Sequence, residues 1–132
     1  MKKQPKQQPP NPQEPGLTIQ VYQDRNGESP FLKWLKKLKN PVNSDRIAQT
    51  LSKIQTTGHI ADWKTLTGAS PIFEIRLHFN TGAYRLYCAW EGKGLIVLLC
   101  AGDKSTQASD IKKAQEYWHD HKQRTSQHDQ LD

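Results

Sequence analysis

Four side chains within residues 72–90 could do chemistry together. Arg76 and His78 alternate along one run of the sequence, and Arg85 and Tyr87 alternate along the next. Arginine offers a phosphate planar, bidentate donors, and its fixed charge stabilises the pentacoordinate transition state of phosphoryl transfer. Histidine titrates near neutral pH, which suits general acid or base catalysis. These residue types therefore indicate a groove that binds and cleaves a phosphodiester.

The register between the two runs decides which side chains share a face of the sheet. A tight turn at Thr81-Gly82 puts apolar side chains together on the core face, in the pairs Phe79–Tyr84, Leu77–Leu86, Ile75–Cys88 and Phe73–Trp90. The opposite face then carries the pairs His78–Arg85 and Arg76–Tyr87, with Glu74 behind them. Packing does not account for such a cluster, so we interpret it as a groove; a solvated charged face is the alternative interpretation.

RNA cleavage needs no metal, because the ribose 2′-hydroxyl attacks the neighbouring phosphate once a base removes its proton and an acid protonates the leaving oxygen. No cluster of carboxylates or of Cys and His residues has the spacing of a metal site, so we expect neither a metal nor a cofactor. The candidate catalytic residues are Arg76, Arg85, Tyr87, His78 and Lys64. Tyr87 and Lys64 could share the proton transfers with His78 if nearby arginines depress their pKa values.

Lys104 is a candidate RNA-binding residue, together with Arg76 and Arg85. It lies in the loop that opens the last predicted helix, where free backbone N–H groups and the helix dipole favour a phosphate. A role in loop solubility, or in capping neighbouring carbonyls, is the alternative interpretation of this lysine.

The composition is that of one basic domain without a membrane segment. The net charge is +6 over 132 residues, which favours a polyanionic partner, either nucleic acid or an acidic protein. No run of about 18 apolar residues and no secretory signal is present, so we expect a cytoplasmic protein. Cys88 and Cys100 lie in apolar runs and are expected to be free, buried thiols.

Apolar periodicity predicts a strand, two helices, three strands and a final helix. The strand spans Leu17–Tyr22, and a proline- and glutamine-rich tail, residues 1–16, precedes it. The first helix is capped by Ser29-Pro30, ends at Asn40-Pro41 and has the apolar stripe Phe31, Trp34, Leu35 and Leu38. The second is capped by Asn43 or Ser44, ends at Gly58 and has the stripe Ile47, Ala48, Leu51 and Ile54. The short link between them predicts an antiparallel helical hairpin.

The second half of the chain predicts a three-stranded antiparallel meander from Ile72 to Ala101. Leu95–Cys100 is its most buried strand, because it is apolar throughout. The last helix starts at Ser105 or Thr106, carries the stripe Ala108, Ile111, Ala114 and Trp118, and should fray beyond it. The sequence therefore predicts an α+β, two-layer fold with an antiparallel sheet over residues 17–122, followed by a disordered polar tail at 123–132.

Several motifs in this order resemble one known family. They are Trp34-Leu-Lys-Lys-Leu38, Phe73-Glu-Ile-Arg-Leu-His-Phe79, Gly82-Ala-Tyr-Arg-Leu-Tyr87, Leu98-Leu-Cys-Ala-Gly-Asp-Lys-Ser-Thr-Gln107 and Asp110-Ile-Lys-Lys-Ala114. The likeness runs from about Leu17 to Trp118. On these residues the chain resembles the RelE/ParE superfamily of toxins, and within it the phage-derived addiction module killer proteins, a HigB-like branch.

The resemblance implies a RelE-like fold and a toxin of a type II toxin–antitoxin system that inhibits translation by cutting mRNA on the ribosome. Its implied partners are the mRNA and a cognate antitoxin of helix-turn-helix type, with no small-molecule cofactor. The positions that match the family's basic residues are Lys64, Arg76, Arg85 and Lys104. Two other functions stay open: a toxin that binds DNA gyrase without cutting RNA, and a host inhibitor that binds RNA without turnover. The density of Arg, Tyr and His on the sheet face favours the nuclease.

Overall fold

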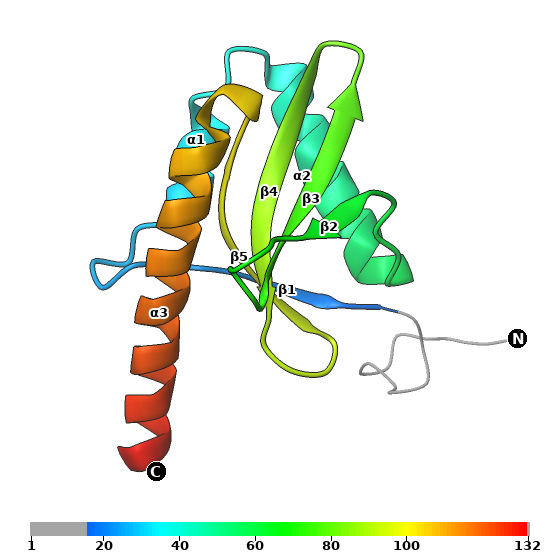
Figure 1. Cartoon of the computed structure of the whole chain (residues 1–132). Helices are drawn as coiled ribbons and strands as arrows, with labels where there is room; N and C mark the ends of the chain where they lie inside the picture. The colour runs from blue at the N-terminus through cyan, green and yellow to red at the C-terminus, as the bar shows by residue number, and fades with distance from the viewer. Residues whose placement is uncertain (1–15, 132) are drawn as a thin grey trace, which may run out of the picture.

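A computed structural model describes residues 16–131, with side chains placed through residue 126; residues 1–15 of the predicted N-terminal tail lie outside this part. The protein is a mixed α+β fold with one five-stranded sheet and three α-helices. The elements are β1 (Thr18–Val21), α1 (Pro30–Lys36), α2 (Pro41–Thr57), β2 (Trp63–Thr65), β3 (Ile72–Phe79), β4 (Gly82–Trp90), β5 (Leu95–Gly102), a 3₁₀ helix (Lys104–Thr106) and α3 (Gln107–Leu131) (Figure 1).

The sheet is mixed rather than antiparallel, in the strand order β1-β5-β4-β3-β2. The predicted meander of β3, β4 and β5 is confirmed. However, β1 pairs with β5 in parallel, so the prediction of a wholly antiparallel sheet is wrong. Alternation in Leu17–Tyr22 indicates a strand but not its direction. The prediction also missed β2, an exposed edge strand of three residues that is too short to show periodicity.

Helices cover both faces of the sheet, so the predicted two-layer arrangement is also wrong. One core joins residues of α1 and α2, including Phe31 and Ile47, to one face of the sheet. A second core joins Ala114 and Ile111 of α3 to the other face (Figure 1). Two positions of the predicted helical stripes, Ala48 and Ala108, are exposed instead.

A β-bulge in β5 fits this strand to its two cores. Tyr87 pairs with Cys100 and Cys88 pairs with Leu98, which leaves Leu99 as an extra residue. Because of this extra residue, Leu99 and Cys100 both belong to the core under α3. Cys88 and Cys100 are free and buried, as expected, and burial raises the pKa of Cys100 to about 12.

The β3–β4 register differs by two residues from the predicted one. The turn is formed by Asn80 and Thr81, so Phe79 lies opposite Gly82. The polar face carries the pairs Glu74–Tyr87, Arg76–Arg85 and His78–Ala83, in place of His78–Arg85 and Arg76–Tyr87. Because the shift is even, every side chain still lies on its predicted face. The predicted cross-strand partners are therefore wrong, and the predicted division of side chains between the two faces is confirmed.

Helix ends follow local capping, with two corrections. Ser29 caps α1, and Gly58 ends α2 in the left-handed conformation at φ 74°, both as predicted. However, α2 is capped by Asn40 rather than by Asn43 or Ser44. α3 runs on to Leu131, so the expected fraying after Trp118 is wrong. None of the helices in residues 16–131 combines the length and the apolar character that crossing a bilayer requires.

A buried side chain, Asn43, joins the first turn of α2 to the β3–β4 turn. Its amide nitrogen donates to the Tyr84 hydroxyl at 2.7 Å and to the Thr81 carbonyl at 3.3 Å. Its amide oxygen accepts from the Thr81 hydroxyl. Since only 1% of Asn43 is exposed, these bonds satisfy a polar group that would otherwise be costly to bury.

We expect Asn43→Ala to lower the free energy of unfolding by about 1–3 kcal/mol, because it removes three hydrogen bonds in a buried setting. Urea denaturation would measure the change. Val42→Ala is the matched control, since Val42 is 51% exposed on the same helical turn and should change stability little. An Asn43→Ala protein as stable as wild type would show that this contact does not hold α2 to the sheet.

Candidate functional site

The centre of the polar face is a carboxylate, Glu74, with none of its side chain exposed. Its Oε2 lies 2.9 Å from Arg76 Nε, and its Oε1 lies 3.4 Å from Arg85 Nε. Its Oε1 also accepts a 2.9 Å hydrogen bond from Gln107 Nε2 at the start of α3. We call Glu74, Arg76, Arg85 and Gln107 the arginine clamp. It joins β3, β4 and α3 through a single side chain.

The β3–β4 register makes this carboxylate necessary. Arg76 and Arg85 are directly opposed across the two strands, an arrangement of like charges that is unfavourable by itself. Glu74 supplies the compensating charge, and its hydrogen bond raises the pKa of Arg76 above the ordinary value. The arginine side chains are 31% and 20% exposed, so part of each remains open to a ligand. A buried charge of this kind is stable only while it stays paired.

Gly102 allows the start of α3 to approach the sheet. A Cβ at this position would lie 1.9 Å from Asp110 Oδ2 and 2.6 Å from Thr106 Oγ1, so no other residue fits without movement. Thr106 Oγ1 also donates to Asp110 Oδ2, which fixes the first turn of the helix. Gly102 lies opposite Arg85 in the sheet. The close approach therefore brings the N-terminal end of α3 next to the clamp.

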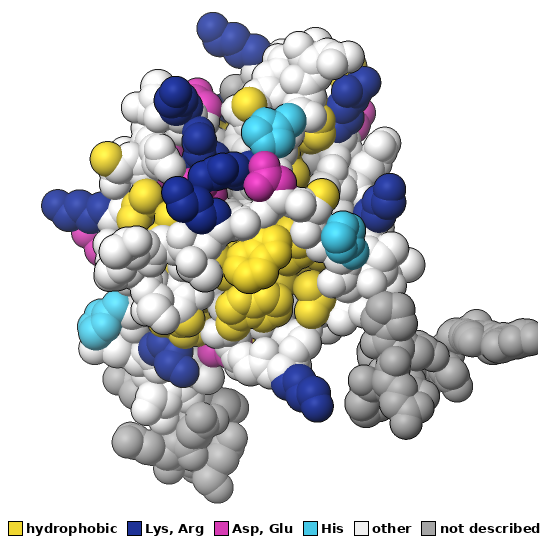
Figure 2. Space-filling model, turned by 45° about the vertical axis from the view of Figure 1, so that its right-hand side comes forward, with side chains coloured by type: hydrophobic (Ala, Val, Ile, Leu, Met, Phe, Trp, Pro, Cys, Tyr) yellow, Lys and Arg dark blue, Asp and Glu magenta, His cyan; other side chains and the backbone are white. Residues whose placement is uncertain are grey.

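Two exposed lysines flank the clamp. Lys64 lies on β2 directly opposite Glu74, and Lys104 lies in the 3₁₀ helix that leads into α3. Figure 2 shows a gathering of Lys and Arg side chains on one part of the molecule, beside a histidine and an acidic side chain. The structure thus places three of the basic residues singled out from the sequence, Lys64, Arg76 and Arg85, around Glu74, and the fourth, Lys104, at the entry to α3.

His78 lies at the outer end of the same face, two residues beyond Arg76. Its side chain is 66% exposed, and its Nε2 lies 2.8 Å from Asp62 Oδ2. Asp62 also accepts a backbone hydrogen bond from Arg76 N at 2.9 Å, which fixes the Asp62 backbone against β3. A carboxylate on one ring nitrogen orients the imidazole and leaves the other nitrogen free for a proton. His78 is thereby held beside the clamp rather than within it.

Tyr87 does not share this open face, although it follows the expected alternation. Its side chain is fully buried opposite Glu74, and its hydroxyl has no hydrogen-bond partner. Burial, and then the charge of Glu74, raise the pKa of Tyr87 above its ordinary value. The nearby arginine was expected to lower that pKa, but the structure gives the opposite net direction. Tyr87 therefore lacks the access and the acidity for proton transfer.

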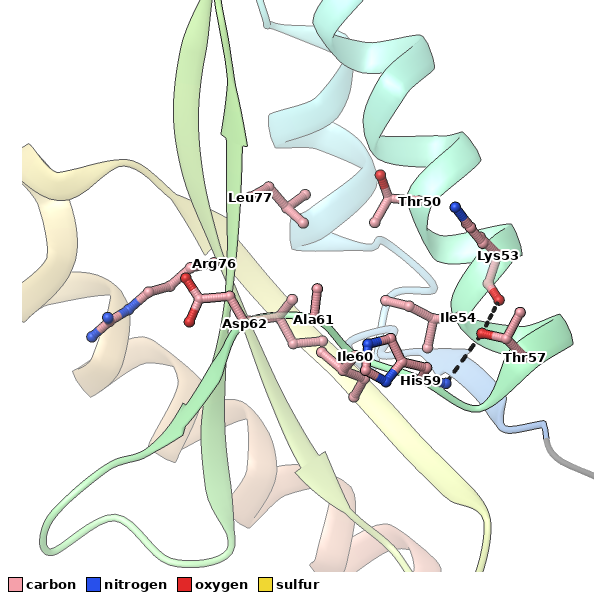
Figure 3. A pocket seen from close by; sticks show the side chains of 11 residues that line it. Thr50, Lys53, Ile54, Thr57, His59, Ile60, Ala61, Asp62, Arg76 and Leu77 are labelled. Carbon is pink, nitrogen blue, oxygen red and sulfur yellow. Dashed lines mark hydrogen bonds between the residues drawn. The ribbon is translucent and has the colours of Figure 1, made fainter.

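A cavity of about 240 Å³ lies on the other side of β3, between that strand and α2. Its walls include Ile54, Ile60 and Leu77, and Lys53 and His59 also line it. In Figure 3 the guanidinium of Arg76 extends away from the side chains of α2. Arg76 and Asp62 also line the cavity, so it borders the arginine clamp along β3. No group of three or more His, Cys, Asp or Glu residues suited to a metal ion occurs in the part of the chain that the structure describes.

Sequence reasoning missed the central roles of Glu74 and Gln107. Glu74 was placed behind the arginines, but nothing in its local sequence distinguishes a buried carboxylate from a solvated one. Gln107 lies 33 residues further along the chain, so its contact depends on how α3 packs. One signal was available: two arginines on opposed strands require a negative charge between them, and Glu74 is the acidic residue of β3.

We expect Tyr87→Phe to be neutral or to raise the free energy of unfolding by up to about 1–3 kcal/mol, because it removes a buried hydroxyl that has no partner. Thermal or urea denaturation would measure this. The same variant should retain the biological activity of the wild type. Loss of activity in a Tyr87→Phe protein of normal stability would contradict this conclusion and would support a catalytic role of the Tyr87 hydroxyl.

Comparison with known proteins places most of this architecture in one family. The family model described as "Phage derived protein Gp49-like (DUF891)" matches residues 33–118. An uncharacterized protein of Haemophilus influenzae is 40% identical over 98 residues, which are 74% of this chain and 91% of that protein. The matched span contains the whole arginine clamp and both flanking lysines. The chain therefore belongs to the Gp49-like family of phage-derived proteins.

Proposed function

We propose that this protein is the toxin of a type II toxin–antitoxin pair and that it cleaves mRNA on the ribosome without a metal ion. The observation that carries the proposal is the arginine clamp, in which a fully buried carboxylate holds two opposed, partly exposed arginines. Arginines held in this way form a preorganised site for a phosphodiester, whose charge they neutralise without first reorganising.

The basic residues divide into two tasks. Arg76 and Arg85 bind the scissile phosphate and stabilise the charge that develops on it. Glu74 accepts a hydrogen bond from Arg76 and lies 3.4 Å from Arg85 Nε, which has no hydrogen-bond partner of its own. Lys64 and Lys104 carry no such constraint and contact neighbouring phosphates, which adds affinity that depends on salt concentration.

The proton transfers fall to His78 in this proposal, with Lys64 as the second group. His78 is exposed, and Asp62 orients its ring, so a free ring nitrogen can take the proton of the ribose 2′-hydroxyl. The 2′-oxygen then attacks phosphorus, the bond to the 5′-oxygen breaks, and that oxygen receives a proton from the second group, Lys64. Tyr87 has no part in this step because it is buried.

The toxin role rests on the family. Gp49-like proteins are associated with addiction-module killer proteins, and the resemblance of the sequence motifs to RelE/ParE toxins, in particular to the HigB-like branch, points the same way. A protein of this kind requires a cognate antitoxin, which we propose is a helix-turn-helix protein that covers the basic face. The net charge of +6 suits both an RNA target and an acidic segment of an antitoxin.

We expect Arg85→Ala and Arg76→Ala to abolish growth arrest when the protein is induced without its antitoxin. Each should lower mRNA cleavage about a hundredfold or more, the magnitude for loss of one preorganised transition-state donor. Primer extension on a reporter mRNA from briefly induced cells would measure cleavage, and plasmid supercoiling would be measured in the same cultures. Arg85→Lys tests the requirement for a bidentate donor at unchanged charge.

Lys36→Ala is the matched control, because it removes the same charge from α1, whose core lies on the opposite face of the sheet. This variant should cleave mRNA like the wild type. Intact mRNA together with growth arrest and altered supercoiling would contradict the nuclease proposal and would indicate a toxin that acts on DNA gyrase. RNA binding and growth arrest without cleavage products would replace it with a non-catalytic RNA-binding inhibitor.

A further inference from the structure

Two exposed tryptophans, one on β2 and one at the end of β4, flank a buried aromatic ring. Trp63 is 46% exposed and Trp90 is 38% exposed. Phe73, which is buried, packs edge-on against Trp63 at 5.7 Å between ring centroids and stacks on Trp90 at 5.0 Å. We call these three rings the aromatic platform. One side of each indole is therefore fixed by Phe73, while a large part of each indole remains in contact with solvent.

Core packing does not require this exposure. Two other large apolar side chains in the described residues, Leu32 and Val42, are also more than a third exposed, but each is a single aliphatic group on a helix. The tryptophans differ because both indoles pack on the same buried ring, Phe73. Joined, exposed apolar surface of this kind is characteristic of a binding site.

The platform adjoins the basic residues of the site. Trp63 immediately precedes Lys64 on edge strand β2, and their side chains alternate between the two faces. Lys64 lies opposite Glu74 of the arginine clamp, and Trp63 lies opposite Ile75. Figure 2 shows an apolar patch directly beside the gathering of Lys and Arg side chains, on the same side of the molecule. A ligand that passes around the edge of β2 would meet both surfaces in turn.

The chemistry of the two neighbouring surfaces fits single-stranded RNA better than a protein segment. Unpaired bases stack on exposed aromatic rings, and the phosphates between them require nearby cations. An exposed aromatic ring, Trp63, and a cation, Lys64, are neighbours on β2, and the net charge of the chain is +6. The acidic residue next to Trp63, Asp62, is engaged in a hydrogen bond with His78, 2.8 Å from its Nε2.

We propose that the aromatic platform stacks unpaired bases of the RNA strand whose phosphates lie on the arginine clamp and Lys64. This inference rests on the proposed function, because it extends the same RNA across the edge of the sheet. Stacking on an indole does not depend on base identity, so the platform contributes affinity and guides the path of the RNA, and it adds no sequence preference.

The test measures binding of two fluorescent, single-stranded probes by anisotropy: a short 2′-O-methyl oligoadenylate, which has no free 2′-hydroxyl, and an abasic backbone of equal length. We expect Trp63→Ala to weaken binding of the oligoadenylate about tenfold or more and to leave binding of the abasic probe unchanged. Trp63→Phe should keep most of the affinity. Leu32→Ala, which removes an exposed apolar side chain on α1, should change neither probe.

Other outcomes separate the two proposals. If Trp63→Ala binds both probes like the wild type while Arg76→Ala weakens both, the stacking inference is overturned and the RNA surface stands. If neither Arg76→Ala nor Arg85→Ala weakens either probe, the proposed function fails and the platform loses its ligand. If Trp63→Ala and Trp63→Phe both leave RNA binding intact but lose the cognate antitoxin in co-purification, the platform is a protein-docking surface instead.

Discussion

The site depends on one ionic contact, the buried carboxylate of Glu74 between Arg76 and Arg85. Without this contact, Arg76 and Arg85 would lie opposite each other as unscreened like charges, and the buried carboxylate would have no compensating charge. With this contact, the negative charge of Glu74 offsets the repulsion, and both arginines stay charged and partly exposed. Removing either side of such a buried pair is costly, because the remaining charge stays behind without a partner. Stability of the sheet and readiness for an anionic ligand are therefore linked through the same side chain.

The rest of the fold delivers the groups that complete this contact. The bulge at Leu99 turns two successive residues of β5 toward α3, and Gly102 lets the start of that helix reach the sheet. Gln107 is thereby placed to donate to Glu74. At the β2 edge of the sheet, two neighbouring side chains lie on opposite faces. Lys64 lies on the face of the clamp, and Trp63 lies on the other face. A short edge strand thus connects the arginine clamp with the aromatic platform.

Much of the fold could be predicted from periodicity alone, because apolar spacing identifies strands and helices before their partners are known. The polar face of β3 and β4 was predicted correctly, even though the turn was placed one residue late and each cross-strand partner was wrong. Strand direction in β1 and the position of β2 could not be predicted, since they depend on how distant segments meet. For the same reason, Tyr87 follows the alternation of the polar face but is covered in the folded protein, while Glu74 gives no local sign of its burial.

The most direct test of the role of Glu74 is to separate RNA binding from cleavage in Glu74→Gln, which removes the charge at nearly unchanged volume. Single-turnover cleavage of mRNA on purified ribosomes would be compared with the affinity of the variant for a non-cleavable RNA, after melting curves establish that it is folded. A positioning role predicts that affinity is retained or increased, because one negative charge is lost, while the cleavage rate falls about a hundredfold or more. A folded Glu74→Gln protein that cleaves mRNA at the wild-type rate would contradict the account.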